Sequence, residues 1–250
     1  MSEHVKPERR GALNVIRMNR PDKKNAITRA MYAEMAQALT AGDADAEVRC
    51  HVILGVPGAF SSGNDIADFM VVATGGEGGM EVYDFLTALA TAQKPIVSGV
   101  DGIAVGIGTT INLHCDLTLA TARTEFRTPF VDLGLVPEAG SSLIAPRLIG
   151  RQNAFALLGL GEAFSAERAR EVGLIHAVVP EDQLETETLA LAERVAQKPP
   201  EALKIARDLM LGDREELVAR IKEEGQHFRA RLKSDEARNA FMAFMARKKG

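Results

Sequence analysis

The sequence predicts an α/β domain built on a parallel sheet and followed by a helical C-terminal region. Short apolar runs at 50–56, 95–100 and 116–120 are typical of buried strands. Helical periodicity separates the second run from the third, which is typical of a right-handed parallel crossover. From position 140 onward the pattern is almost wholly helical, with one further strand expected near 175–179.

Local signals place the remaining N-terminal elements. A strand is expected over 11–18, and Thr28 is a suitable N-cap for a helix that reaches about position 41. Helical periodicity resumes over 81–92. A last helix of this half is expected to follow the glycine-punctuated stretch after position 100 and to end near His114.

The C-terminal helical region begins at Pro199-Pro200. This divides the chain into a core over 1–198 and a helical region over 199–250. The apolar face of that region is rich in Phe and Met, more than a lone terminal helix requires. Two interpretations remain open: the face packs on the core of its own chain, or it packs on neighbouring subunits.

Composition excludes several classes of function. Hydrophobic residues make up 46% and charged residues 26% of the 250-residue chain, and its formal net charge is −4, so no basic field indicates a nucleic-acid partner. Cys50 and Cys115 each lie in an apolar run, which favours buried cysteines in a reducing compartment. Neither a secretory signal nor a membrane span is expected, and the sequence predicts a soluble cytoplasmic protein.

Two glycine-rich turns stand where a buried strand precedes a helix. They are Phe60 to Ile66 and Asp101 to Gly108. Glycine lets the backbone approach a ligand closely, and the first N–H groups of a helix lack partners. Two such turns after neighbouring parallel strands could direct one N–H each at a single carbonyl oxygen, as an oxyanion hole requires. The same turns also occur for packing reasons alone. A dinucleotide-binding fingerprint is excluded for the second turn, because its third glycine is replaced by Ile111.

An ordered set of motifs resembles the crotonase (enoyl-CoA hydratase/isomerase) superfamily. The matching segments are 18–28, 60–66, 101–108 with Cys115-Asp116, 133–142, 146–150 and 169–175. The resemblance implies a crotonase-like ββα superhelix with a C-terminal helical trimerisation region, assembled as a homotrimer or a dimer of trimers. It implies an acyl-CoA substrate, with coenzyme A as part of that substrate and no separate metal or redox cofactor.

The same resemblance implies where the substrate lies. It puts the oxyanion hole at the backbone N–H groups of Asn64 and Ile107. Apart from the resemblance, we expect the loop over 71–80 to shape the acyl pocket. Other substrate-binding positions, most of them along the path of coenzyme A, are Lys24, Ala26, Ser62, Gly63, Asp65, Ile66, Gly106 and Phe130.

The catalytic carboxylates favour isomerisation over hydration. Hydratases of the family use two glutamates, and motif alignment puts Thr110 and Phe130 at those positions. Neither side chain is a general base at neutral pH. Glu138, in Val-Pro-Glu-Ala-Gly, resembles the acid/base of the Δ3,Δ2-enoyl-CoA isomerase branch. Moving a double bond requires only one base, and apolar neighbours raise the pKa of a carboxyl group toward the working range.

Other interpretations of the same residues remain. Glu138 could instead complement the dipole of the helix that follows it, and Asp132 could be a base but is more typical of a turn or cap. His51 and His114, single histidines in apolar runs, are assigned no role. At the level of function, the alternatives are an enoyl-CoA hydratase or acyl-CoA thioester hydrolase on the same scaffold, and a catalytically silent acyl-CoA-binding protein.

Overall fold

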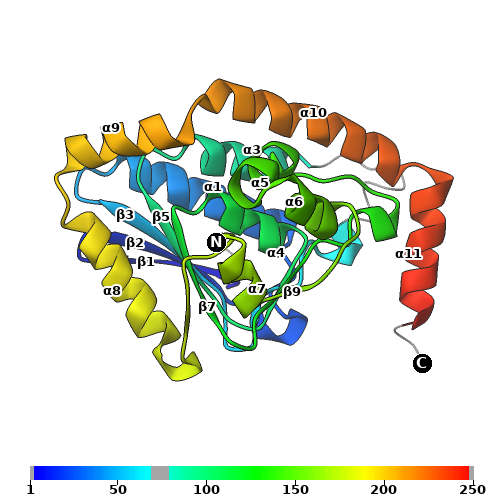
Figure 1. Ribbon diagram of the computed structural model, residues 1–250, viewed down its shortest axis with the longest axis horizontal. Helices are drawn as coiled ribbons and strands as arrows, with labels where there is room; N and C mark the ends of the chain where they lie inside the picture. The colour runs from blue at the N-terminus through cyan, green and yellow to red at the C-terminus, as the bar shows by residue number, and fades with distance from the viewer. Residues whose placement is uncertain (1–2, 69–78, 248–250) are drawn as a thin grey trace.

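Two mixed sheets surrounded by helices make up the chain in a computed structural model that describes residues 3–68 and 79–247 (Figure 1). The strands are β1 (Val5–Arg10), β2 (Leu13–Met18), β3 (Cys50–Leu54), β4 (Ala59–Ser61), β5 (Ile96–Val100), β6 (Ile103–Val105), β7 (Leu117–Thr121), β8 (Glu125–Arg127), β9 (Phe164–Ser165) and β10 (Ala177–Val179). The α-helices are α1 (Arg29–Ala44), α3 (Met80–Thr91), α4 (Ile107–Thr110), α5 (Ser141–Ile149), α6 (Arg151–Leu158), α7 (Ala166–Glu171), α8 (Leu184–Ala196), α9 (Pro200–Leu211), α10 (Arg214–Leu232) and α11 (Asp235–Arg247). Short 3-10 helices are η1 (Pro21–Lys23), η2 (Ile111–His114), η3 (Val131–Leu133) and η4 (Glu181–Gln183).

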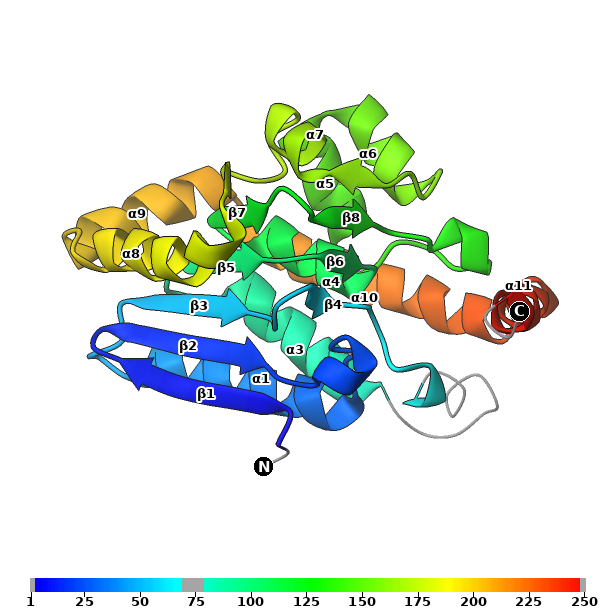
Figure 2. The same ribbon diagram turned by 90° about the horizontal axis from the view of Figure 1, so that it is seen from below.

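The larger sheet has the strand order β1-β2-β3-β5-β7-β10, and the smaller sheet has the order β4-β6-β8-β9. Every pair in the larger sheet is parallel except β1 with β2. In the smaller sheet β4, β6 and β8 pair in parallel and β9 is antiparallel to β8. Figure 2 shows that the two sheets are successive: β3 leads toward β4, and β5 toward β6. The chain excursions that begin with β3, β5 and β7 therefore each add a strand to both sheets before the next α-helix described.

Helices cover the larger sheet on both faces because its strands are apolar on both faces. Cys50, Val52 and Leu54 of β3 pack in one cluster with Ala192 of α8, while Ile53 points to the opposite cluster. That second cluster contains the apolar stripes of α1 and α3. Alternate residues of one strand thus serve two cores, which is why the run reads as continuously hydrophobic.

The predicted α/β class is confirmed, and most predicted elements lie within a few residues of their expected bounds. Thr28 caps α1 as expected, with its Oγ1 accepting a hydrogen bond from the Met31 N–H at 3.3 Å. The crossover predicted from the third apolar run is confirmed by the parallel pairing of β5 with β7.

Several strands were not predicted. β1 was missed because five of its six residues are exposed, so it carries no alternating apolar pattern. β4, β6, β8 and β9 have two or three residues each, which is too short for a periodicity. In consequence the first glycine turn begins inside a strand: Phe60 and Ser61 belong to β4 and are buried.

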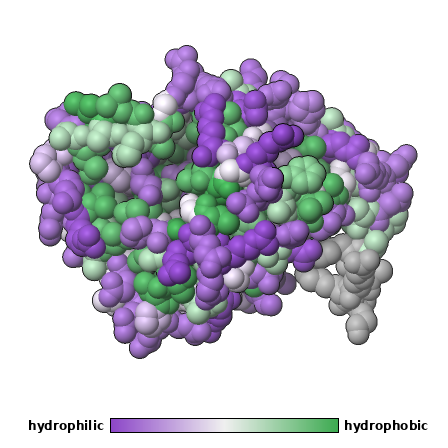
Figure 3. All heavy atoms as spheres, in the orientation of Figure 1, coloured by the Kyte–Doolittle hydropathy of each residue, from purple (hydrophilic) through white to green (hydrophobic). Residues whose placement is uncertain are grey.

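The C-terminal helices reach across the molecule. α10 extends over α3 and α5 from the end at which α9 lies to the end at which α11 lies (Figure 1). α9 carries four exposed apolar side chains, Ile205, Leu209, Met210 and Leu211. Figure 3 shows a hydrophobic area at the end of the molecule where α9 lies. The division at 198/199 stays a prediction. Within the described residues, no helix combines the length and the apolar character needed to cross a membrane.

Candidate active site

The two glycine turns lie side by side because they leave neighbouring parallel strands. β4 pairs with β6, and the chain beyond each strand stays in contact. A Cβ added to Gly63 would lie 3.1 Å from the Val105 carbonyl oxygen, and one added to Gly108 would lie 2.7 Å from the Ser61 carbonyl oxygen. The contact at Gly108 is with backbone, so any larger residue there would push the turns apart. The juxtaposition expected from the sequence is present.

The backbone amide of Asn64 is directed away from its strand neighbour. Asn64 forms an isolated parallel bridge with Ile27, in which Ile27 uses both of its own backbone groups: its N–H donates to the Gly63 carbonyl and its carbonyl accepts from the Asp65 N–H. Because C=O and N–H of one trans peptide point in opposite directions, the Asn64 N–H points away from Ile27. Among the described residues it has no hydrogen-bond partner.

The amide of Ile107 is available for a different reason. Ile107 is the first residue of α4, where an N–H has no intrahelical acceptor. Gly106 precedes it with φ 57°, a left-handed conformation that glycine adopts without strain. The Ile107 side chain is buried in the core. Its identity therefore matters to packing, while the backbone N–H remains the polar group at this turn.

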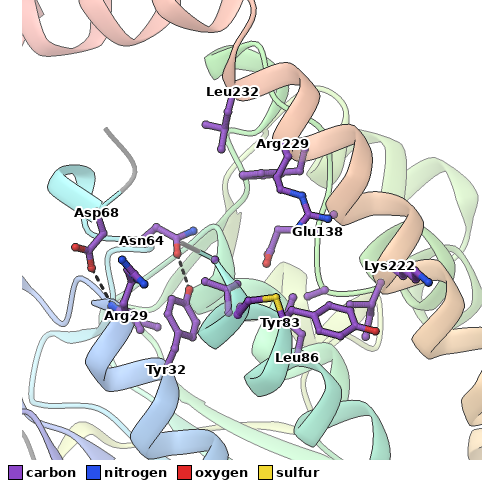
Figure 4. A pocket seen from close by; sticks show the side chains of 18 of the residues that line it. Arg29, Tyr32, Asn64, Asp68, Tyr83, Leu86, Glu138, Lys222, Arg229 and Leu232 are labelled. Atoms are coloured by element: carbon purple, nitrogen blue, oxygen red, sulfur yellow. Dashed lines mark hydrogen bonds between the residues drawn. The ribbon is translucent and has the colours of Figure 1, made fainter. Parts of the chain in front are cut away.

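A cavity of about 380 Å³ lies between α1, α3, the residue 138 turn and α10 (Figure 4). Most of its wall is apolar or aromatic, and α10 contributes one side of it. The lining residues with a functional side chain are Arg29, Tyr32, Asn64, Asp65, Asp68, Tyr83, Glu138, Lys222 and Arg229. The chain has two tyrosines, and both line this cavity.

Glu138 is a buried carboxylic acid directed into the cavity (Figure 4). Burial raises the pKa of Glu138 to about 8, and the nearby Glu224 carboxylate also raises it, against the opposing effect of a hydrogen bond from Thr110. The Thr110 hydroxyl donates to Glu138 Oε1 at 2.6 Å. Oε2 has no recorded partner within the described residues, so it is the oxygen left to face a ligand. Thr110, which the motif resemblance puts at one of the two hydratase glutamate positions, thus provides a hydroxyl that binds the Glu138 carboxyl group.

Glu138 does not complement the helix that follows. That helix, α5, starts at Ser141, and the N–H groups at its start donate to Glu224 of α10: Gly140 N–H to Oε2 at 2.6 Å and Ser142 N–H to Oε1 at 2.9 Å. The dipole of α5 is thus met by Glu224, which leaves the Glu138 side chain to Thr110 and the cavity. Burial raises the pKa of Glu224 as well.

The backbone after Glu138 is strained. Ala139 has φ 63° and Gly140 has φ 67°. A left-handed conformation costs a residue with a Cβ about 1–2 kcal/mol. Strain of this kind persists only where the surroundings determine the conformation. It turns the chain so that Glu138 faces the cavity while Ala139 is packed in the core.

Tyr32 connects α1 to the first glycine turn. Its hydroxyl donates to Asn64 Oδ1 at 2.6 Å, and its ring packs against Phe85 with centroids 5.5 Å apart. Burial raises the pKa of Tyr32 well above its ordinary value, so the hydroxyl keeps its proton. The Asn64 side chain is held by this bond on the wall of the cavity (Figure 4).

Of the predicted site residues, only Asn64, Asp65 and Glu138 line the cavity. Asp65 is paired with Arg20 at 2.5 Å, a half-buried ion pair that fixes the turn and is not free for a ligand. Phe130 lies beside Gly106, with 3.8 Å between its ring and a Cβ placed there, and does not line the cavity.

The remaining predicted substrate contacts form a strip outside the cavity. They are Lys24, Ala26, Ser62, Gly63 and Ile66, and Lys24 is exposed. The strip is held together by backbone: the Ser62 N–H donates to the Lys24 carbonyl at 2.9 Å. Of the loop expected to shape the acyl pocket, residues 71–78 lie outside the described residues, while Gly79 and Met80 line the cavity.

Asp132, His51 and Cys115, also considered from the sequence, have contacts or burial typical of residues that stabilise the fold. Asp132 is half exposed in an ion pair with Arg127 and lies off the cavity, as a turn residue would. His51 is buried between Asn14 and Asp43. Burial raises the pKa of Cys115 to about 12, so it carries no thiolate near neutral pH.

Several residues at the site were not identified from the sequence. Tyr32 lies on the same apolar stripe of α1 as Met31 and Met35 and is indistinguishable there from a core residue. Thr110 was considered only as the absence of a glutamate. Glu224 lies within a highly charged helix, where it resembles a solvent-facing residue.

Comparisons with known proteins match most of the chain to one protein family. Residues 8–250 match the family described as Enoyl-CoA hydratase/isomerase. The chain is 36% identical over 244 residues to enoyl-CoA delta isomerase 2 of Rattus norvegicus, covering 95% of this chain and 62% of that protein. It is 31% identical over 238 residues to 1,2-epoxyphenylacetyl-CoA isomerase of Escherichia coli (strain K12), covering 92% of this chain and 91% of that protein. The chain thus spans less than two thirds of the rat relative.

Solved structures confirm the fold. OdaA of Pseudomonas aeruginosa aligns with a TM-score of 0.92 and 43% identity, covering 98% of this chain and 99% of that one. An enoyl-CoA hydratase/isomerase from Pseudoalteromonas atlantica T6c also aligns with a TM-score of 0.92, at 34% identity and with 98% of each chain covered. The crotonase-like fold expected from the motifs is therefore confirmed, with its two mixed sheets and C-terminal helices.

Proposed function

The chain belongs to the enoyl-CoA hydratase/isomerase family, and from that premise we propose that it shifts the double bond of an enoyl-CoA thioester from Δ3 to Δ2. One observation carries the proposal: among the described carboxyl groups that line the cavity, Glu138 is the buried one, and it lies opposite the Asn64 turn. The motif resemblance puts a threonine and a phenylalanine at the two hydratase glutamate positions. The two relatives reported above are isomerases by name, which supports the same choice.

In the proposed reaction Glu138 is the only acid/base. Its carboxylate takes a proton from C2 of the 3-enoyl thioester, and the electrons move into the thioester carbonyl to form a dienolate. The N–H groups of Asn64 and Ile107 stabilise that oxyanion, because neither donates to an acceptor within 3–68 and 79–247 and both lie on the two adjoining turns. Glu138 then returns the proton to C4, which leaves the conjugated 2-enoyl thioester. Thr110 holds Oε1 throughout, so Oε2 carries the proton.

Coenzyme A is proposed to lie outside the acyl cavity, along the strip formed by Lys24, Ala26, Ser62, Gly63 and Ile66. Lys23 and Lys24 are exposed there, whereas the Arg20 guanidinium is occupied by Asp65. A homotrimer or dimer of trimers remains our proposal for the assembly. The exposed apolar side chains of α9 support a contact with neighbouring subunits at that helix.

The proposal is tested with trans-3-hexenoyl-CoA, by following the absorbance of the conjugated 2-enoyl thioester. Mass spectrometry of the product separates the alternatives, because isomerisation conserves mass, hydration adds one water, and thioester hydrolysis releases free coenzyme A. Tight binding of the CoA ester without turnover would instead identify a silent acyl-CoA-binding protein.

The pH dependence of the reaction follows from the state of Glu138. The base must be ionised, and burial raises its pKa to about 8. We therefore expect kcat/KM to rise with pH through an apparent pKa near 8 and to be low where Glu138 is protonated. A kcat/KM profile measured with 3-hexenoyl-CoA checks this. A rate that stays constant between about pH 6 and 9 would exclude Glu138 as the titrating base.

Tyr32→Phe is expected to lower kcat by about 3–10-fold, because it removes the hydrogen bond that holds Asn64. Little change in the melting temperature is expected, since the ring and its contact with Phe85 remain. Tyr83→Phe is the matched control, a second tyrosine of the same cavity whose hydroxyl has no recorded partner within the described residues. Equal rates for the two variants would show that the Tyr32 hydroxyl has no part in holding the turn.

A further inference from the structure

The peptide unit between Ala139 and Gly140 is held through both of its polar groups. Its carbonyl oxygen lies 2.7 Å from His114 Nε2, and its N–H donates to Glu224 Oε2 at 2.6 Å. A carbonyl oxygen only accepts, so His114 Nε2 carries the hydrogen. This peptide unit is separated from Glu138, the residue that carries the base, only by the Glu138–Ala139 peptide.

The side chains of His114 and Glu224 form a clamp on this peptide unit, and both are buried. His114 is 7% exposed and Glu224 is 6% exposed. Burial lowers the pKa of His114 to about 4, so the imidazole is neutral and donates through Nε2 near neutral pH. His114 ends η2 and Glu224 lies in the middle of α10. Two segments far apart in the chain therefore meet on one peptide unit.

The peptide unit held by His114 and Glu224 joins two residues in the left-handed conformation, which is strained at Ala139. Ala139 and Gly140 are consecutive left-handed residues, and among the described residues only Lys24, Asn25 and Ala139 have positive φ without being glycine. A change of the Ala139 backbone from its left-handed conformation to a relaxed one is a rotation that would redirect the chain on the Glu138 side and carry the Glu138 carboxyl group away from Thr110. Polar clamps on both sides oppose that rotation.

We propose that His114 and Glu224 are positioning residues that hold the Ala139–Gly140 peptide and thereby keep the Glu138 carboxyl group against Thr110 and open to the cavity. The inference rests on the proposed function in that it takes Glu138 to be the base. His114 acts from the core side of the turn and Glu224 from the α10 side, so α10 supplies part of the support for the site as well as part of the cavity wall.

His114→Leu removes the donor and His114→Gln restores an N–H near the position of Nε2. We expect His114→Leu to lower kcat by about 10²-fold with KM changed less than about twofold, because a misplaced base slows the chemical step and leaves CoA binding intact. His114→Gln is expected to recover most of the lost rate. Equal kcat for wild type and the leucine variant, or equal losses in both variants, would overturn the role of the donor.

Glu224→Gln has a second signature in the pH profile. Within the described residues, Arg220 on the same helix acts on the Glu224 carboxyl, and the Glu224 charge raises the pKa of Glu138 across the turn. Glu138 shares the cavity wall with the charged side chains of Arg29, Asp65, Asp68, Lys222 and Arg229, all of which both variants leave in place. Removing the Glu224 charge should lower the apparent pKa at which kcat/KM rises with pH, and the variant should also have a lower kcat. His114→Leu removes no charge at neutral pH, so its kcat/KM should rise at the same pH as that of the wild type. An unchanged apparent pKa in Glu224→Gln would contradict the proposed contact of Glu224 with the Glu138 turn.

Amide hydrogen exchange at Gly140 tests the clamp without catalysis. Faster exchange in His114→Leu and Glu224→Gln, with unchanged exchange in the strands of the core, is expected if both side chains hold this peptide. An inert wild type with faster Gly140 exchange in the variants would refute the isomerase proposal and leave the clamp standing. An active wild type whose variants match it in both kcat and exchange would refute the clamp alone.

Discussion

Glu138→Gln is expected to lower kcat for isomerisation of 3-hexenoyl-CoA by about 10²–10⁴-fold, the usual loss when a single general base is removed. Glutamine has nearly the same shape and its amide oxygen can accept the Thr110 hydrogen bond, so the turn should keep its conformation. It cannot take a proton from C2. Affinity for a saturated acyl-CoA should therefore change little, and steady-state kinetics together with calorimetric binding measure the two effects separately.

Asp132→Asn is the matched control for this experiment. It neutralises the other carboxylate considered as a base, which is half exposed, paired with Arg127 and away from the cavity. Its kcat should equal that of the wild type. A fully active Glu138→Gln protein would show that Glu138 is not the general base. A large loss of kcat in Asp132→Asn would instead assign that role to Asp132.

Arg207→Met is expected to lower the free energy of unfolding by about 3 kcal/mol, because it leaves a partly buried carboxylate without its cation. Arg207 of α9 is 3% exposed and donates to Asp116 Oδ1 at 2.8 Å and to the Ala92 carbonyl at 2.6 Å. Asp116 in turn accepts from the Ile96 N–H at 2.8 Å, at the start of β5. The pair joins α9 to the larger sheet at the start of its inner strand β5. Urea unfolding followed by circular dichroism measures the change.

Lys204→Met on the same helix is the control for this pair. Lys204 and Asp208 form an exposed i,i+4 ion pair at 2.9 Å, which is expected to contribute about 0.5 kcal/mol or less. The difference between the two variants isolates burial, since both remove one cation from α9. If both variants unfold at the same urea concentration as the wild type, Arg207 does not anchor the helix to the core.

The sequence predicted the elements whose signals are local. The Thr28 cap, the apolar stripe of α1 and the buried run of β3 each depend on neighbouring residues alone. β1 could not be predicted, since one residue of its six is buried and its place in the sheet depends on pairing with β2. The two-residue and three-residue strands of the smaller sheet likewise exist only through their partners.

In the candidate site, too, the residues with a local sequence signal could be predicted and those positioned by long-range contacts could not. Glu138 and the two amide turns could be predicted because motif order and the physics of strand–turn–helix junctions identify them. The contact of Thr110 with Glu138 joins residues 28 positions apart, and that of Glu224 with Gly140 joins residues 84 apart. Neither has a local pattern, and both depend on how η2 and α10 pack around the turn. His114 could be recognised as a core histidine, but its partner, a strained backbone carbonyl, exists only in the folded chain.

Because of where its two tyrosines lie, the intrinsic tyrosine fluorescence of this protein can be used to measure ligand binding in the cavity. The chain contains no tryptophan, and Tyr32 and Tyr83 both line the cavity. The tyrosine emission of the native protein, excited at wavelengths that phenylalanine does not absorb, therefore originates from the walls of the proposed acyl pocket. Any quenching or enhancement when an acyl chain enters reports occupancy of that pocket directly, without an attached label. The Tyr83→Phe and Tyr32→Phe variants then assign the signal to the two sides of the pocket.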